Sequence, residues 1–190
     1  MAPFKIAVVV GSNRRESVNR RLAEALARLG GGNRFDFRFV RIDDLPLYNQ
    51  DLEADLPASV VRFKAEIEAA DGILVVTPEH SRSIPAVLKN AIDWGTRPWG
   101  KNSWDGKVAA VTGASPGAIG TAVAQQHLRQ VLGNVGVLVM GGEAYIAVKP
   151  DTFGASGNLA DDSSRAFLND FIDRFAALLA RFTAPVRVAA

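Results

Sequence analysis

A polar loop at residues 11–19 carries the first groups that could do chemistry, and it lies between an apolar run at residues 4–10 and a helical pattern. The free N–H groups and the dipole at the start of a helix favour an anion. The loop adds hydroxyl and amide donors, and Arg14 adds a guanidinium fork that suits phosphate oxygens. Its one glycine, Gly11, and the absence of a following Gly-Lys-Ser/Thr exclude a GxGxxG dinucleotide loop and a P-loop. The neutral donors are Ser12, Ser17 and Asn19, of which the last two could instead simply cap the helix.

Two later loops also follow apolar runs. In residues 77–85, Pro78 and Pro85 stiffen the backbone, which can then present N–H and C=O groups to the polar edge of a planar ring. Ser83 in this loop is counted among the ligand-binding candidates, although it could cap the next helix. Residues 113–121 hold three glycines, which permit close approach to a flat ligand but also occur in ordinary turns. Three such loops in one chain favour a ligand site over coincidence.

The segments that must position these loops alternate between strand and helix. Valine-rich runs at residues 4–10, 73–76, 108–112 and 135–140 do not alternate with polar residues, as is typical of parallel strands buried on both faces. Residues 35–40 alternate with charges and predict an edge strand. We therefore expect an α/β fold: a flavodoxin-like, doubly wound, five-stranded parallel sheet of order 2-1-3-4-5 with helices on both faces. Such sheets bind ligands at the carboxyl ends of their strands, where the strand order reverses.

Apolar residues at helical spacing predict a helix after each strand. The first is expected to end at the glycines of residues 30–32. The third is expected to present Ile84, Val87, Leu88, Ala91 and Ile92, and the last Phe167, Phe171, Phe175, Leu178 and Phe182.

Composition narrows the function further. The 190 residues suit one domain spanning residues 1–190. The chain has no cysteine, which excludes thiol redox chemistry and iron–sulfur clusters, so a bound cofactor must carry any electrons. Its two histidines, His80 and His127, form no metal motif, and His127 is expected to be a packed helix residue. A net charge of +2 without a basic run gives nucleic-acid binding little support. With no membrane-length apolar run and no signal-peptide pattern, we expect a cytoplasmic protein without a membrane span.

The motifs together resemble the NAD(P)H-dependent FMN reductase family, including its quinone and chromate reductases. The segments that carry the likeness are residues 11–14 with Ser17 and Asn19, residues 45–51, residues 78–79, 83–85 and 88–94, and residues 113–117 with Gln125 and residues 127–130. The resemblance implies a flavodoxin-like fold, tightly bound FMN, NADH or NADPH as co-substrate, and a homodimer or tetramer with the flavin near a subunit interface.

The resemblance also implies roles for individual residues. The phosphate would be held by Ser12, Arg14, Ser17 and Asn19. The isoalloxazine ring would be lined, largely through backbone groups, by Pro78, Glu79, His80 and Ser81, and its other edge would be closed by Gly113, Ser115 and Gly117.

The chain departs from the family pattern in three places. The family usually has Tyr-Asn where this chain has His80-Ser81, and this puts the acceptor pocket in doubt. It usually has a glycine at Thr121 and an arginine at Val123, so a tetramer that relies on that arginine is in doubt.

The implied reaction passes hydride from NAD(P)H to the flavin and then electrons to a small acceptor such as a quinone, a ferric complex, chromate or free flavin. It needs no catalytic nucleophile from the protein. His80 could protonate a quinone, or could be a spacer whose backbone alone matters. Arg97 could meet the nicotinamide phosphate or an anionic acceptor, or could form a surface or interface salt bridge. The alternatives are a flavodoxin-type electron carrier without its own substrate and a non-catalytic interaction protein.

Overall fold

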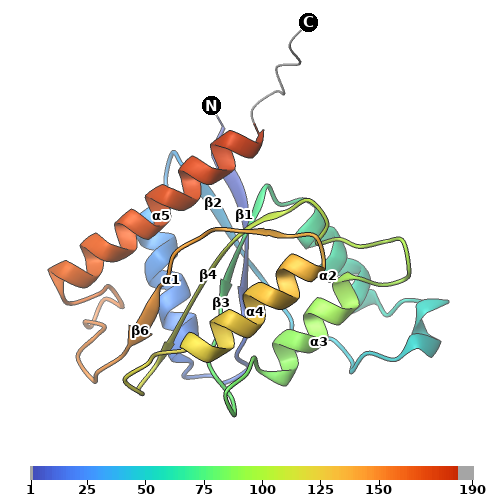
Figure 1. Ribbon diagram of the computed structural model, residues 1–190, viewed down its shortest axis with the longest axis horizontal. Coiled ribbons are helices and arrows are strands. Elements are labelled where there is room, and N and C mark those ends of the chain that lie inside the picture. The colour runs from blue at the N-terminus through green and yellow to red at the C-terminus, as the bar shows by residue number, and fades with distance from the viewer. Residues whose placement is uncertain (1, 184–190) are drawn as a thin grey trace, which may run out of the picture.

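The computed structural model describes residues 2–183 (Figure 1). In chain order the elements are β1 (Phe4–Val10), α1 (Val18–Gly30), β2 (Phe35–Val40), the 3-10 helix η1 (Gln50–Glu53), α2 (Ala58–Glu68), β3 (Gly72–Val76), α3 (Ala86–Gly95), β4 (Val108–Ser115), α4 (Ala122–Asn134), β5 (Leu138–Val139), β6 (Tyr145–Ala147) and α5 (Asp162–Thr183).

The sheet is parallel and has the order β2-β1-β3-β4-β5, so the predicted topology is confirmed. β2 is an edge strand, as its alternating charges predict. The strand predicted at residues 135–140 is present but shorter than expected, because only Leu138 and Val139 pair with β4. The chain then turns through Gly142, which has a positive φ of 91°, and returns as β6 beside the last residues of β4. Two short strands therefore share the fifth position of the sheet.

Helices cover both faces of the sheet, as expected. α1 and α5 pack on one face, against Ile6 and Val8 of β1, and α2, α3 and α4 pack on the other, against Ala7 and Val9 (Figure 1). Successive residues of a buried strand point to opposite faces, and this is why the strands are apolar throughout. No helix among residues 2–183 is both long and apolar enough to cross a membrane.

Two helical faces differ from the predicted ones. In α5 the predicted Phe167 and Phe182 are 42% and 59% exposed. The predicted Phe171 and Phe175 are buried, and the rest of the buried face consists of Leu168, Ile172 and Leu179. The predicted set left out the leucine and isoleucine residues at neighbouring positions, which cover the sheet equally well. Ile84 precedes α3, because Pro85 stands directly before its first turn.

Candidate functional site

The three loops meet at the carboxyl ends of β1, β3 and β4, where they line a cavity of about 560 Å³. The expected residues on its wall are Ser12, Arg14, Ser17, Asn19, Pro78, Glu79, His80 and Ser115. The wall also includes Gly11, Asn13, Val18, Pro85, Ala86, Val87, Ala114 and Pro116, none of which was individually assigned a ligand-binding role from the sequence. All of these belong to the three loops or to the helix turns that follow them, so loop boundaries were the available signal for them.

The first loop is tightly packed where it follows β1. The amide of Gly11 donates to the carbonyl of Val76 at 2.9 Å, and a Cβ at Gly11 would lie 3.1 Å from a methyl carbon of Leu88. Ser17 is buried, and its Oγ accepts a hydrogen bond from the amide of Arg20 at 3.2 Å, which makes it the N-cap of α1. Arg14 is exposed, and within the described residues its guanidinium has no acidic partner. The loop therefore offers a helix N-terminus and an uncommitted cation at one end of the cavity.

Asn19 lines the cavity and also makes a structural contact that was not expected. Its Nδ2 donates to the carbonyl of Ala114 at 2.9 Å, and its Oδ1 accepts from the amide of Ala114 at 2.8 Å. The side chain is buried and both of its polar groups are used in this pairing. Asn19 therefore ties the start of α1 to the end of β4 and fixes the distance between the first and third loops.

The backbone of the third loop packs directly against the backbone of the second loop. A Cβ at Gly113 would lie 2.0 Å from the carbonyl oxygen of Thr77, so only glycine fits there. Further along, the amide of Gly117 donates to Ser115 Oγ at 3.0 Å. Gly113 and Gly117 are not on the cavity wall, and both act by shaping the path of the chain.

The second loop ends in a tight hairpin. His80 and Ser83 exchange amide-to-carbonyl hydrogen bonds of 3.0 and 2.9 Å, and the two residues between them have φ values of 49° for Ser81 and 62° for Arg82. Two positive φ angles define a type I′ turn, which normally takes Asn-Gly and costs energy with other residues. Ser81 and Ser83 do not line the cavity, and Ser83 does not cap α3, which starts after Pro85 without a side-chain cap.

Glu79 connects this loop to α4. Its carboxylate is 8% exposed, and Oε2 accepts from the amides of Val123 at 3.0 Å and Ala124 at 3.1 Å. Thr121 precedes α4 but forms no side-chain cap, so Glu79 supplies the cap from another element. The other oxygen, Oε1, accepts from Arg82 Nη1 at 3.0 Å.

Arg97 does not lie on the cavity. Its Nε donates to Glu53 Oε1 at 2.6 Å, and the hydroxyl of Tyr48 donates to the same oxygen at 2.6 Å. The hydrogen bond from Arg97, followed by that from Tyr48, lowers the pKa of Glu53, and the hydrogen bond to Glu53 raises the pKa of Tyr48. Within one copy of the chain, Arg97 thus forms the salt bridge that was its alternative interpretation.

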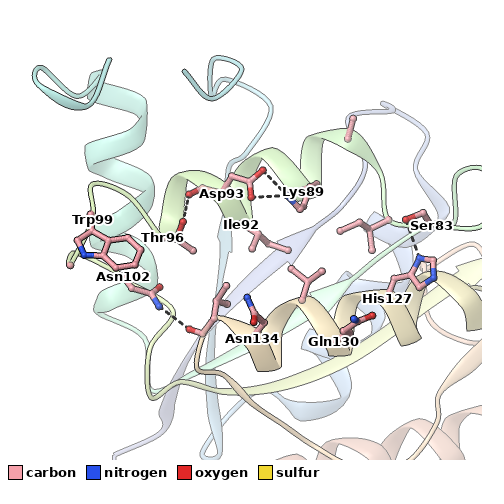
Figure 2. A pocket seen from close by; sticks show the side chains of 15 residues that line it. Ser83, Lys89, Ile92, Asp93, Thr96, Trp99, Asn102, His127, Gln130 and Asn134 are labelled. Atoms are coloured by element: carbon pink, nitrogen blue, oxygen red, sulfur yellow. Dashed lines mark hydrogen bonds and ion pairs between the residues drawn. The ribbon is translucent and has the colours of Figure 1, made fainter. Parts of the chain in front are cut away.

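A larger groove of about 1300 Å³ runs between α3 and α4 (Figure 2). Ala86 lines both this groove and the loop cavity, so the two are adjacent. His127 is exposed in the groove, with its Nδ1 3.1 Å from Ser83 Oγ, so the expectation that it packs in the interior was wrong. Its i−4 and i+4 neighbours Val123 and Val131 are themselves only half-buried, so they do not define the inner face of α4.

The arrangement of donors fits a phosphorylated planar ligand. Arg14 and the start of α1 provide anion-binding groups at one end of the cavity. The prolines Pro78, Pro85 and Pro116 provide flat apolar walls at the other. The site residues thus have the chemistry that FMN requires.

Comparison with known proteins agrees with this reading. The model of the NADPH-dependent FMN reductase family matches residues 4–151. The chain is 50% identical over 175 residues to a 2-hydroxy-1,4-benzoquinone reductase of Burkholderia sp, covering 92% of this chain and 95% of that protein. It is 47% identical to a quinone reductase of Pseudomonas putida, covering 91% and 93%. The solved structure of FerB, a flavoenzyme NAD(P)H:(acceptor) oxidoreductase from Paracoccus denitrificans, superposes with a TM-score of 0.91 at 46% identity, covering 94% of this chain and 98% of that one. The chain belongs to the NADPH-dependent FMN reductase family.

Proposed function

We propose that the chain is an FMN-dependent NAD(P)H:acceptor oxidoreductase that acts on a quinone or another small acceptor. The observation that carries this proposal is the meeting of three loops in one cavity whose two ends suit a phosphate and a planar ring. When bound, FMN supplies the redox chemistry by taking hydride from NADH or NADPH and passing electrons to the acceptor in a second half-reaction.

At the phosphate end, the residues divide into ligands and supports. Ser12 and Arg14 face the cavity with donors that remain available to an anion. Ser17 caps α1 through its Oγ acceptor and keeps its O–H for the ligand. Asn19 joins the loop to β4 through Ala114, and the second N–H of its Nδ2 remains for the ligand, because Asn19 also lines the cavity.

At the ring end, backbone groups of the second and third loops face the ligand. Pro78, Glu79 and His80 line one side and Ser115 lines another. Pro78 has no N–H and the amide of His80 donates to the carbonyl of Ser83, so among these three residues the amide of Glu79 would stabilise negative charge on a reduced ring. Glu79 holds this side in place through α4, and Gly113 lets the two loops approach.

A quinone is the acceptor that the relatives' names favour. Ferric complexes, chromate and free flavin remain candidate acceptors. His80 is the departure from the family pattern nearest the ring, and its side chain is exposed while its backbone is held by Ser83. We expect a His80→Phe variant to keep quinone turnover unchanged from about pH 6 to pH 8, because the hairpin backbone is the part that acts. A loss of quinone turnover in the His80→Phe variant would instead assign proton transfer to His80.

A stopped-flow experiment tests the function. Anaerobic mixing of the FMN-loaded protein with NADH or NADPH should bleach the flavin absorbance, and later addition of a quinone should restore it. Flavin that neither nicotinamide can reduce would overturn the enzyme proposal in favour of a flavodoxin-type carrier. The exposed Arg14 and the basic pI of about 9.1 speak against a carrier of that type, which is usually acidic.

The resemblance also implies a homodimer or tetramer, and we propose this assembly as well, together with the cytoplasmic location expected from the sequence. The groove between α3 and α4 is the surface to examine, since it adjoins the loop cavity and includes Trp99, which is 88% exposed. Analytical ultracentrifugation should give a mass at least twice that of one chain.

A further inference from the structure

A second cavity of about 560 Å³ lies on the opposite side of the phosphate loop from the ring end. It shares Ser12, Asn13 and Arg14 with the proposed FMN cavity and extends to the carboxyl end of β2. Its volume falls within the roughly 300–1,000 Å³ of small-molecule sites. A ligand anchored at the phosphate loop can therefore continue into this cavity, which we call the β2 groove.

The β2 groove is rich in arginine. Arg14, Arg15, Arg20 and Arg41 line it, against two carboxylates, Glu24 and Asp43. Both carboxylates already form ion pairs. Arg20 Nε lies 2.7 Å from Glu24 Oε1, and Arg41 Nε lies 2.8 Å from Asp43 Oδ1. Arg14 and Arg15 have no acidic partner within residues 2–183. The groove thus carries surplus positive charge, as a phosphate site requires.

The groove also has a surface suited to a flat base. The guanidinium carbon of Arg20 lies 4.0 Å from the ring centroid of Phe39, and both residues line the groove. A guanidinium held flat by an aromatic ring can stack a second planar group on its other side. Val40 and Ile42 add apolar wall, so the lining combines stacking, apolar and cationic groups.

Arg41 and Asp43 lie at the position where dinucleotide-binding sheets bind a ribose and its phosphate. Both follow the end of β2 directly, beside the loop that ends β1. In dinucleotide-binding sheets this is where an acidic residue binds ribose hydroxyls and an arginine accommodates a 2′-phosphate. The hydrogen bond from Arg41 lowers the pKa of Asp43, which keeps that carboxylate ionised as a hydroxyl acceptor.

We propose that the β2 groove is an adenylate subsite, which binds the adenosine phosphate half of a dinucleotide next to the FMN phosphate site. This rests on the proposed function for the presence of a flavin phosphate at residues 11–19. The adenylate has two chemical sources. It is either the 2′-phosphorylated half of NADPH or the adenosine monophosphate half of FAD.

The test uses the FMN-loaded protein and two probes, adenosine 2′,5′-bisphosphate and 5′-AMP, titrated by calorimetry. Arg15→Ala and Arg41→Ala should each weaken binding of the bisphosphate about tenfold, the effect of losing about 1.4 kcal/mol. Arg38→Ala is the matched control, because Arg38 pairs with Asp36 two residues away as Arg41 pairs with Asp43, but lies outside the groove. Arg38→Ala should leave binding unchanged.

Two further measurements distinguish NADPH from FAD as the source of the adenylate. If NADPH is the ligand, Arg15→Ala and Arg41→Ala raise the KM for NADPH about tenfold and leave kcat and the KM for NADH unchanged. If FAD is the ligand, the same variants weaken FAD relative to FMN in titrations of the apo-protein and do not alter either KM. Either result supports the subsite.

The proposal is overturned if neither probe binds, or if the Arg15 and Arg41 variants behave like the Arg38 control in every assay. That failure is distinct from failure of the proposed function. A protein that reduces quinone with NADH but ignores both probes keeps its function and loses only the subsite. A protein that takes up no FMN loses its proposed function, while the probes still test the groove in the apo-protein.

Discussion

Removing the carboxylate of Glu79 should destabilise the protein far more than an ordinary surface carboxylate would. Glu79→Ala leaves the amides of Val123 and Ala124 without their acceptor at the start of α4, and no residue of α4 can replace it. Hydrogen bonds to charged groups contribute about 1.5–3 kcal/mol, and a lost N-cap typically costs about 1 kcal/mol. Because the two amides share one oxygen, we expect a loss of about 3 kcal/mol in the free energy of unfolding.

Glu79→Gln separates the hydrogen bonds from the charge. The amide oxygen of glutamine can still accept from Val123 and Ala124, while the interaction with the helix dipole, about 0.3–1 kcal/mol, is lost. The ion pair with Arg82 contributes little, because the Arg82 side chain is 69% exposed. We therefore expect a cost of about 1 kcal/mol for Glu79→Gln.

Urea denaturation of the apo-protein, followed by far-UV circular dichroism, measures these differences. Glu66→Ala serves as the control, since Glu66 is 40% exposed and forms an i,i+4 pair with Arg62, so its loss should cost less than about 0.5 kcal/mol. If Glu79→Ala costs no more than Glu66→Ala, or if Glu79→Gln costs as much as Glu79→Ala, the capping argument is wrong. A titration should also show that Glu79→Ala weakens FMN binding about tenfold more than the control does, because the loop that faces the ring loses its anchor.

Three further predictions follow from local geometry. Asn19→Ala should lower the free energy of unfolding by about 2–3 kcal/mol, since it leaves both backbone groups of Ala114 unsatisfied in a buried position; a thermal melt showing a loss under about 0.5 kcal/mol would contradict the tie between α1 and β4. The double variant Ser81→Asn/Arg82→Gly should raise the free energy of unfolding by about 1 kcal/mol and Tm by about 2–4 °C, because Asn-Gly fits the two positive φ angles; an unchanged Tm would mean that the turn is not strained. The hydrogen bond from Ser163 and those from Ser164 lower the pKa of Asp161 from 3.8 to about 2. A lowered pKa stabilises the fold above the ordinary value and the effect is lost as the pH falls through the folded value. The stability difference between wild type and Asp161→Ala should therefore be constant above about pH 5 and should shrink between about pH 4 and pH 2 in acid-unfolding series.

The sheet could be predicted because its signals are local and repeated. Runs of valine specify buried parallel strands, and the glycines after residue 29 end the first helix where the pattern says. β6 could not be predicted, since it is three residues long, only partly buried, and depends on β4 for its partner. The length of β5 was overestimated for the same reason, because an apolar run does not show where a partner strand becomes available.

The location of the candidate site could be predicted from the sequence, but the hydrogen bonds between its loops could not. The loops that follow β1, β3 and β4 were found from their composition. The tie between Asn19 and Ala114 joins residues 95 positions apart, and the cap from Glu79 to Val123 spans 44 positions, so neither leaves a local pattern. Ser83 shows the opposite error, because a serine near a helix start suggests a cap, while here its backbone is committed to the hairpin with His80.

The two hydrogen bonds between Asn19 and Ala114 also predict which end of a bound flavin would leave the cavity first. They join the phosphate loop to the sheet, so that end of the cavity cannot widen without breaking two buried hydrogen bonds. The hairpin at the ring end contacts α4 through partly buried and exposed side chains, Glu79 to the amides of Val123 and Ala124 and Ser83 to the exposed His127. Dissociation should therefore begin with the ring swinging outward while the phosphate stays anchored, and riboflavin, which lacks the phosphate, should exchange much faster than FMN.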